Sequence, residues 1–300
     1  MKYINLFVFA LCFFTACESE SGFKNYESTQ SFFSKEGVQT QKFSANSSAV
    51  IQFTTAKGNK VIFQPNAFVT MDNIPVNGLV DFEIKEITEV DEMILSNMPT
   101  MSEEGILESG GEFFVRASQN GKKLKLAPNK VMRIEVADVN IYQTMFMQVY
   151  NGKIKADNSV MWTLNKDPLN NITVQTSGKV PTDSSTFMAI MNSDSLNWVN
   201  IDKLASWPNI TYTIKTGNTP DPKATMVFLH FTGRKSVVLY DEALSNKMIE
   251  GPATVIGLCL YDNKLYASFL PINMEDKGSS TLNFAITTEV EFKNRLRLLK

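Results

Sequence analysis

The stretch Gly78-Leu79-Val80-Asp81-Phe82-Glu83-Ile84-Lys85-Glu86 decides the fold class. Apolar and charged side chains alternate along it without a break from Val80 to Lys85. Because successive side chains of a strand point to opposite faces, this pattern is typical of an antiparallel β-strand with one buried face. The same period of two returns at 113–117 and at 132–136, so the sequence predicts a β-sheet at this point.

Turn residues separate further apolar runs at short intervals. Asn120-Gly121 is typical of a type I′ hairpin, and tight turns are also predicted at 57–59, at Asp262-Asn263 and at Asn151-Gly152. Short strands with a turn signal every dozen residues or so are typical of β-sandwiches. The sequence therefore predicts an all-β fold with two or more β-sandwich-like domains.

The C-terminus carries the pattern of a helix. Thr288 precedes Glu291 with the spacing of a capping box, and Phe292, Leu296 and Leu299 form one apolar stripe. We expect a short C-terminal helix that docks on a sheet.

The first residues are typical of an export signal. Lys2 precedes an apolar run from Leu6 to Phe14. At about 1.5 Å per helical residue this run is too short to cross a hydrocarbon core of roughly 30 Å, so a signal peptide over 1–16 is predicted. An ordinary secretory peptide cleaved near Ala16 is one interpretation.

A lipoprotein signal is the other interpretation, and the one preferred. Phe14-Thr15-Ala16-Cys17 resembles the lipobox of bacterial lipoproteins, although Phe14 stands where Leu or Val is usual. The resemblance implies cleavage before Cys17 and acylation of that residue, for example with palmitate. The protein is then expected to be an outer-membrane lipoprotein of the cell envelope, with residues 17–45 as its tether. Display at the surface or at the periplasmic face is left open.

Three segments carry a further likeness: 58–68, 78–86 and Leu107-Glu108-Ser109-Gly110-Gly111. Through these segments residues 46–140 resemble the ZU5-like β-sandwich module of uncharacterised Bacteroidota lipoproteins, with Asn66 where many ZU5 modules have glycine. ZU5 domains are interaction and scaffolding modules, so the resemblance implies no catalytic residues. An irregular β-rich middle region is expected at 141–222, and a C-terminal β-domain with the terminal helix at 223–300.

Composition restricts the chemistry. A formal charge of −2 argues against a nucleic-acid surface, which needs a clustered basic excess. Once Cys12 leaves with the signal and Cys17 is acylated, Cys259 is expected to be a small core residue. His230 is the one histidine, so His-cluster metal sites and most hydrolase motifs are excluded. No metal site, no cofactor and no catalytic residue is predicted, and the chain is not expected to be an enzyme.

Two alternatives with catalytic chemistry are kept. Some ZU5-containing proteins cleave themselves at a His-Phe-Ser step, and His230-Phe231-Thr232 is similar to it, with threonine as the candidate nucleophile. An envelope hydrolase with a carboxylate or hydroxyl site is the other. The adjacent carboxylates at 91–92 and 103–104 are interpreted as solvated turns.

The middle region carries candidate binding residues. Trp198, Trp207 and Tyr212 are a candidate platform for stacking a glycan, and Ser195 within Asp194-Ser195-Leu196 is a candidate O-glycosylation site. Together these observations predict a lipid-anchored cell-envelope protein with a non-catalytic binding or structural role. A protein or glycan partner is expected, in addition to the membrane that holds the anchor.

Overall fold

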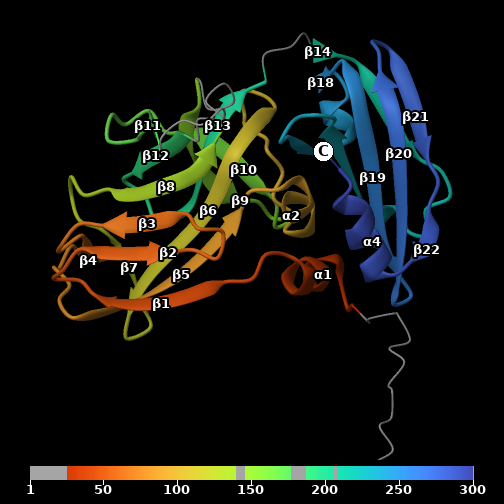
Figure 1. Ribbon diagram of the computed structural model, residues 1–300. Helices are drawn as coiled ribbons and strands as arrows, with labels where there is room; N and C mark the ends of the chain where they lie inside the picture. The colour runs from red at the N-terminus through yellow and green to blue at the C-terminus, as the bar shows by residue number, and fades with distance from the viewer. Residues whose placement is uncertain (1–25, 140–145, 177–186, 206–208, 300) are drawn as a thin grey trace, which may run out of the picture.

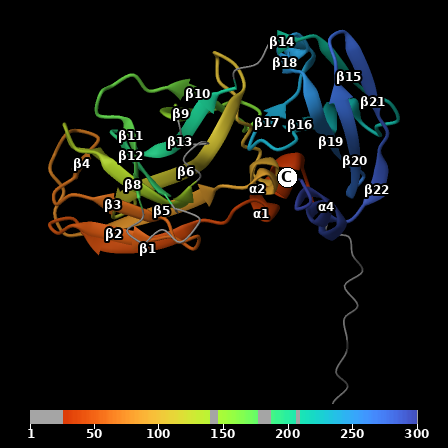
Figure 2. The same cartoon turned by 45° about the horizontal axis from the view of Figure 1, so that its top comes forward.

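The computed structural model describes residues 26–139, 146–176, 187–205 and 209–299. These residues are mostly β, as the sequence predicts, and they form two β bodies that lie side by side (Figure 1). Three short α-helices of the described chain lie where the two bodies meet, which Figure 2 shows from a second direction. The helices are α1 (Thr29–Glu36), α2 (Val90–Leu95) and α4 (Glu289–Leu296).

The first body is a sandwich of two sheets. The first sheet has the order β1-β5-β6-β13-β9-β10, with β7 paired to β6 and β4 to β7, and the second has the order β11-β12-β8-β3-β2. Its strands are β1 (Gln41–Asn46), β2 (Ile51–Thr54), β3 (Lys60–Phe63), β4 (Phe68–Thr70), β5 (Leu79–Ile87), β6 (Leu107–Gln119), β7 (Lys122–Leu126), β8 (Met132–Val139), β9 (Gln148–Ile154), β10 (Val160–Leu164), β11 (Asn171–Thr176), β12 (Phe187–Ser193) and β13 (Asn197–Leu204).

The core of the sandwich lies between these sheets. Val80, Phe82 and Ile84 of β5 are at most 1% exposed, which confirms the predicted inward face. The ring of Phe82 lies 5.3 Å from that of Phe63 and 5.5 Å from that of Phe68, measured between centroids. Burial of such rings is the main favourable term in the stability of the sandwich.

The second, C-terminal body has a sheet of order β17-β16-β19-β20-β22, covered on one face by the pairs β14-β18 and β15-β21. Cys259 is buried in the core between these layers and is not in a disulfide, as expected. The strands are β14 (Asn209–Ile210), β15 (Tyr212–Thr216), β16 (Thr225–Phe231), β17 (Val237–Leu239), β18 (Met248–Ile249), β19 (Gly251–Tyr261), β20 (Lys264–Met274), β21 (Gly278–Leu282) and β22 (Ala285–Thr287), with 3₁₀ turns η1 (Pro222–Ala224) and η2 (Glu242–Leu244).

The helices and both bodies share one apolar cluster. Phe32 of α1 packs edge-on against Phe292 of α4 at 6.0 Å, and both side chains are fully buried. The predicted C-terminal helix is confirmed, because the Thr288 hydroxyl accepts a hydrogen bond of 3.1 Å from the Glu291 amide and Leu296 is buried. An amphipathic helix gains most of its stability from such tertiary packing.

Backbone hydrogen bonds also join the two bodies. The Thr100 amide donates to the Val237 carbonyl at 2.8 Å, and the Ser109 amide donates to the Lys235 carbonyl at 2.8 Å. Glu108 of β6 and Arg234, which follows β16, form an ion pair of 2.6 Å. The bodies therefore meet through main-chain contacts as well as through apolar packing.

The predicted domain boundaries do not coincide with the two bodies. Strands from 141–222 complete both sheets of the sandwich, since β9, β10 and β13 belong to the first sheet and β11 and β12 to the second. The sandwich thus runs from β1 to β13, while β14 and β15 belong to the C-terminal body. Within 17–45, α1 and β1 are regular elements. Pairing between strands far apart in sequence sets these limits.

The hairpin predicted at Asn151-Gly152 is wrong. β9 runs through both residues, and the turn follows at 155–159, where Asn158 has a φ of 60°. A Cβ on Gly152 would lie 2.7 Å from the Cβ of Trp198 and 2.8 Å from the ring of Trp162. This glycine is needed for side-chain packing across the sheet instead of for a turn.

The other predicted turns connect neighbouring strands. Asn120 and Asn263 have φ values of 53° and 54°, and Gly58 has 86°. Residues 1–17, with the predicted signal and lipidation site, lie outside the described residues. No helix in the described part of the chain has both the length and the apolar character to cross a membrane.

Candidate binding groove between the two bodies

A groove follows the junction of the sandwich, α1 and the C-terminal body. It consists of two chambers of about 220 Å³ and about 450 Å³, which share Thr29, Asp157 and Met226 as lining residues. Sites for drug-sized ligands measure about 300–1,000 Å³, and the larger chamber lies within that range. We call the two chambers together the seam groove.

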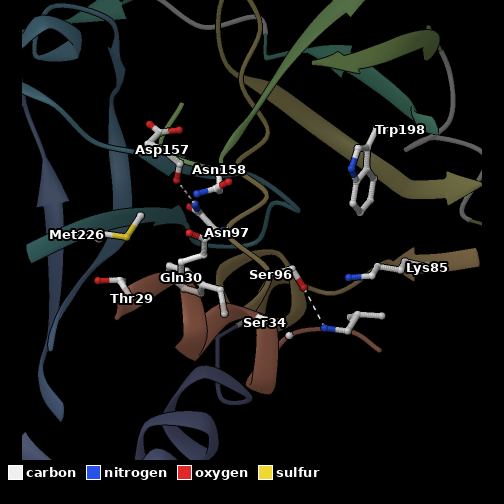
Figure 3. A pocket seen from close by; sticks show the side chains of 13 residues that line it. Thr29, Gln30, Ser34, Lys85, Ser96, Asn97, Asp157, Asn158, Trp198 and Met226 are labelled. Atoms are coloured by element: carbon white, nitrogen blue, oxygen red, sulfur yellow. Dashed lines mark hydrogen bonds between the residues drawn. The ribbon is translucent and has the colours of Figure 1, made fainter. Parts of the chain in front are cut away.

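The smaller chamber is built from segments that are distant in the sequence (Figure 3). Gln30 and Ser34 come from α1, Lys85 from β5 and Trp198 from β13. The full lining is Thr29, Gln30, Phe33, Ser34, Gly37, Val38, Lys85, Ser96, Asn97, Asp157, Asn158, Trp198 and Met226.

Strand β13 contributes the aromatic side chain of Trp198 to this chamber. It pairs across the sheet with Phe114, and the two ring centroids lie 5.2 Å apart. The indole is only partly buried. Gly152 has no side chain, and this leaves space for the Cβ of Trp198. Packing therefore holds the ring in one place and leaves part of it open to the chamber.

Polar groups converge on the same chamber. Asn97 follows α2, where its φ of 54° suits asparagine, and its Nδ2 donates to the Asp157 carbonyl at 3.2 Å. Its side chain is 2% exposed, and its Oδ1 accepts no hydrogen bond from the described residues. This oxygen is shielded from solvent, so Asn97 adds polarity to the chamber wall but offers no open acceptor.

Lys85 adds a cationic donor. Burial lowers the pKa of its ammonium, and the neighbouring Glu83 charge acts in the opposite direction. Lys85 forms no ion pair within the part of the chain that the structure describes. Its three N–H donors are thus available to oxygen atoms of a ligand.

The larger chamber is lined by both apolar and charged side chains. Pro99, Met101 and Met161 line it from the sandwich, and Val227 and Leu239 line it from the C-terminal body. Charged side chains, which include Lys155, Lys223 and Asp241, also line it.

The predicted stacking residues do not form one platform. Trp198 lines the seam groove, and Trp207 lies outside the described residues. Tyr212 is 5% exposed within the core of the C-terminal body, where its hydroxyl lies 2.6 Å from Ser280 Oγ. For Tyr212 the prediction is wrong, because neither face of a buried ring can receive a sugar.

Ser195 lies in the turn between β12 and β13 and is half-buried. Its hydroxyl donates to Asp194 Oδ1 at 3.0 Å, and its amide donates to Ser193 Oγ at 3.2 Å. O-glycosylation of Ser195 stays a prediction, as does acylation of Cys17, which the structure does not describe.

His230 lies on β16 and faces the cluster between the bodies. It is 1% exposed, and its Nδ1 lies 3.2 Å from the Ser236 carbonyl oxygen. Phe231 is buried in the C-terminal core, while Thr232 is exposed. Self-cleavage at this step stays a prediction, and these residues lie apart from the groove lining.

Sequence reasoning missed Lys85, Asn97 and Asp157 as groove residues. Nothing in their neighbourhoods marks them, since each belongs to an ordinary strand, helix end or turn. Comparisons of the chain with models of protein families, with curated proteins and with solved structures found no match. The geometry of the groove is therefore the basis for a functional proposal.

Proposed function

We propose that this protein is a lipid-anchored cell-envelope protein that binds an envelope glycan in the seam groove and catalyses no reaction. The observation that carries the proposal is the fixed, partly open indole of Trp198, which lines the same chamber as the Lys85 ammonium. An aromatic face with a few convergent hydrogen-bonding groups suits sugar rings, which are apolar on their faces and polar at their edges.

The position of α1 supports the link to the membrane. Phe32 of α1 is fully buried, so the described chain is anchored in the folded body close to Tyr26. An extended chain advances about 3.3–3.6 Å per residue, so a lipid on Cys17 would hold Tyr26 within about 32 Å of the bilayer surface. The groove wall formed by α1 would then stay near the membrane, where envelope glycans are attached or anchored.

The glycan proposal is tested with Trp198→Ala. The probes are soluble peptidoglycan fragments and purified outer-membrane polysaccharide, and binding is measured by isothermal titration calorimetry. We expect affinity for one of these probes to fall at least about 10-fold, which corresponds to about 1.4 kcal/mol. Binding of neither probe by the wild-type protein, or unchanged affinity in Trp198→Ala, would contradict the proposal.

A matched tryptophan separates binding from folding. Trp162 is fully buried and its Nε1 donates to the Pro99 carbonyl at 3.0 Å. Trp162→Phe should lower the melting temperature through lost packing and an unpaired carbonyl, and should leave the affinity of the folded fraction unchanged.

The anchor is tested separately with Cys17→Ser. We expect this variant to leave the membrane fraction while its affinity for glycan stays the same. A variant that still sediments with membranes would show that the anchor is not a lipid on Cys17.

A further inference from the structure

A polar cluster is buried on the outer face of the first sheet, which is the face turned toward the C-terminal body. In the strand register Asn200 of β13 lies opposite Glu112 of β6 and opposite Tyr150 of β9. Asp202, two residues beyond Asn200 and therefore on the same face, lies opposite Ser109. We call these five residues the buried acidic cluster.

A β-bulge in β6 places Ser109 and Glu112 on one face. The register shifts between Ile201 and Asp202, which allows an extra residue on β6. Gly111 has a φ of 140°, and a Cβ on Gly110 would lie 3.0 Å from the Ile201 carbonyl oxygen. Both glycines are therefore required for the bulge, and the bulge turns the Ser109 side chain toward Asp202.

Several oxygens of the cluster are buried without a hydrogen bond. Glu112 and Asp202 are 0% exposed and Tyr150 is 1% exposed. Within the described residues, neither carboxylate oxygen of Glu112 accepts a hydrogen bond, and the Tyr150 hydroxyl makes none. The Asp202 carboxylate interacts with the Ser109 hydroxyl and the Gly110 amide, although its Oδ1 has no partner at close hydrogen-bond geometry.

Asn200 Nδ2 donates to Asp202 Oδ2 at 2.6 Å. Ser109 Oγ donates to Asn200 Oδ1 at 3.1 Å and accepts from the Gly111 amide at 3.1 Å, which leaves each of these two oxygens a lone pair.

Positive side chains nearby are directed to a different carboxylate. Arg234 lies 2.6 Å and Lys203 lies 3.4 Å from Glu108, and no Lys or Arg of the described chain pairs with Glu112 or Asp202. Burial raises the pKa of Glu112 well above its ordinary value, and the charge of Asp202 adds to the effect. Buried carboxylates are normally paired with a cation or bound to a metal, because an unpaired buried charge is very costly.

We propose that the buried acidic cluster binds one calcium ion. The carboxylates of Glu112 and Asp202 would balance its charge of +2, and neutral oxygens of Tyr150, Ser109 and Asn200 together with water would complete its coordination. Calcium accepts six to eight oxygen ligands in flexible geometry, whereas magnesium demands a near-ideal octahedron and keeps several waters. A closed, all-oxygen site therefore suits calcium better.

This site would use fewer acidic ligands than a typical metal cluster. The described chain contains no group of three or more His, Cys, Asp or Glu side chains arranged to hold an ion. No metal site was expected from the sequence, because Glu112 and Asp202 are far apart along the chain and neither stands in a metal-binding motif. The strand register and the bulge bring them together.

The native protein provides the first test. We expect elemental analysis of the purified full-length mature chain to find about one calcium per chain. Because the site is closed, the ion is removed by unfolding in EDTA and refolding without metal. The metal-free protein should melt about 5–10 °C lower than protein refolded with calcium at a hundred times its dissociation constant.

Isosteric variants provide the second test. Glu112→Gln and Asp202→Asn remove one charge each and keep the side-chain volume, so both should fold, and both should lose at least nine-tenths of the bound calcium. The matched control is Glu86→Gln. Glu86 is 1% exposed on the opposite face of the same sheet, where its Oε1 accepts hydrogen bonds from Thr55 and Asn59. This variant should keep its calcium.

Three outcomes would overturn the proposal. One is native protein without stoichiometric calcium together with a melting temperature that added calcium does not change. Another is loss of calcium from Glu86→Gln equal to that from Glu112→Gln. A stoichiometric metal other than calcium would overturn the assignment of the ion. None of these results depends on whether the seam groove binds a glycan.

Discussion

The two faces of the first sheet differ although the same strands form both. The inner face carries Phe82, Phe113 and Val199, which are at most 1% exposed and pack against the second sheet. The outer face carries Trp198 in the seam groove and Glu112 in the buried acidic cluster. The inner face also carries the buried Glu86, but Thr55 and Asn59 donate hydrogen bonds to its Oε1, whereas neither oxygen of Glu112 accepts one from the described residues. Binding functions are therefore proposed on the outer face alone.

The largest expected effect is on the inner face. Phe82→Ala removes a fully buried ring that contacts three other phenylalanines, and we expect it to lower the free energy of unfolding by about 3–5 kcal/mol. Chemical denaturation measures the loss. Calcium content and glycan affinity of the folded fraction should not change, and a change in either would show that the two faces are coupled.

Gly152→Ala tests the packing of the outer face. The added methyl group would lie 2.7 Å from the Cβ of Trp198, so we expect a loss of about 1–3 kcal/mol and a weaker glycan interaction as the indole moves. Thermal melts and calorimetry measure these two effects. Lys153→Ala, on the next residue of the same strand, is the control and should change neither; a tolerated Gly152→Ala would contradict the predicted clash.

The pH dependence of calcium-free protein tests the acidic cluster. Burial raises the pKa of Glu112 and of Asp202, so the folded state holds protons that the unfolded state has released. Below the unfolded carboxyl pKa of about 4, the bound protons contribute their full stabilisation of the folded state. As the pH rises from there through the raised folded pKa, this stabilisation should be lost. Between these two pKa values, each carboxyl should lower the free energy of unfolding by about 1.4 kcal/mol for every pH unit.

Denaturation curves at a series of pH values measure this slope. A Glu112→Gln, Asp202→Asn double variant should show a flatter profile, and so should the wild-type protein with calcium bound. A wild-type profile without any decline above pH 4 would contradict the assignment of the raised pKa values.

The smallest effect is expected where the outer face is open to solvent. Arg116 and Glu83 form an ion pair of 2.6 Å, and their side chains are 46% and 29% exposed. Exposed pairs contribute about 0–1 kcal/mol because water and salt screen them. Arg116→Ala should change the midpoint of urea denaturation only slightly, and a loss comparable to that of Phe82→Ala would break the contrast between covered and open parts of this face.

Local signals predict the elements well where one face of a strand meets a uniform core. The alternation from Val80 to Ile84 places these residues correctly, and Thr288 caps the predicted helix. The same reasoning misplaces the turn at Asn151-Gly152, because a glycine required by remote tryptophans looks the same in sequence as a glycine required by a hairpin. The prediction for Tyr212 is wrong for a similar reason, since an aromatic residue gives no local sign of burial.

By itself the sequence determined the all-β class, most of the strands and the C-terminal helix, because hydrophobic period and turn chemistry act between near neighbours. Only the tertiary structure decided that residues 141–204 complete the sandwich, that Trp198 lines a groove with α1, and that Glu112 lies near Asp202. Strand pairing and the contact of the two bodies join residues that are far apart along the chain. No local sequence pattern predicts which distant segments will cover a given face of the sheet.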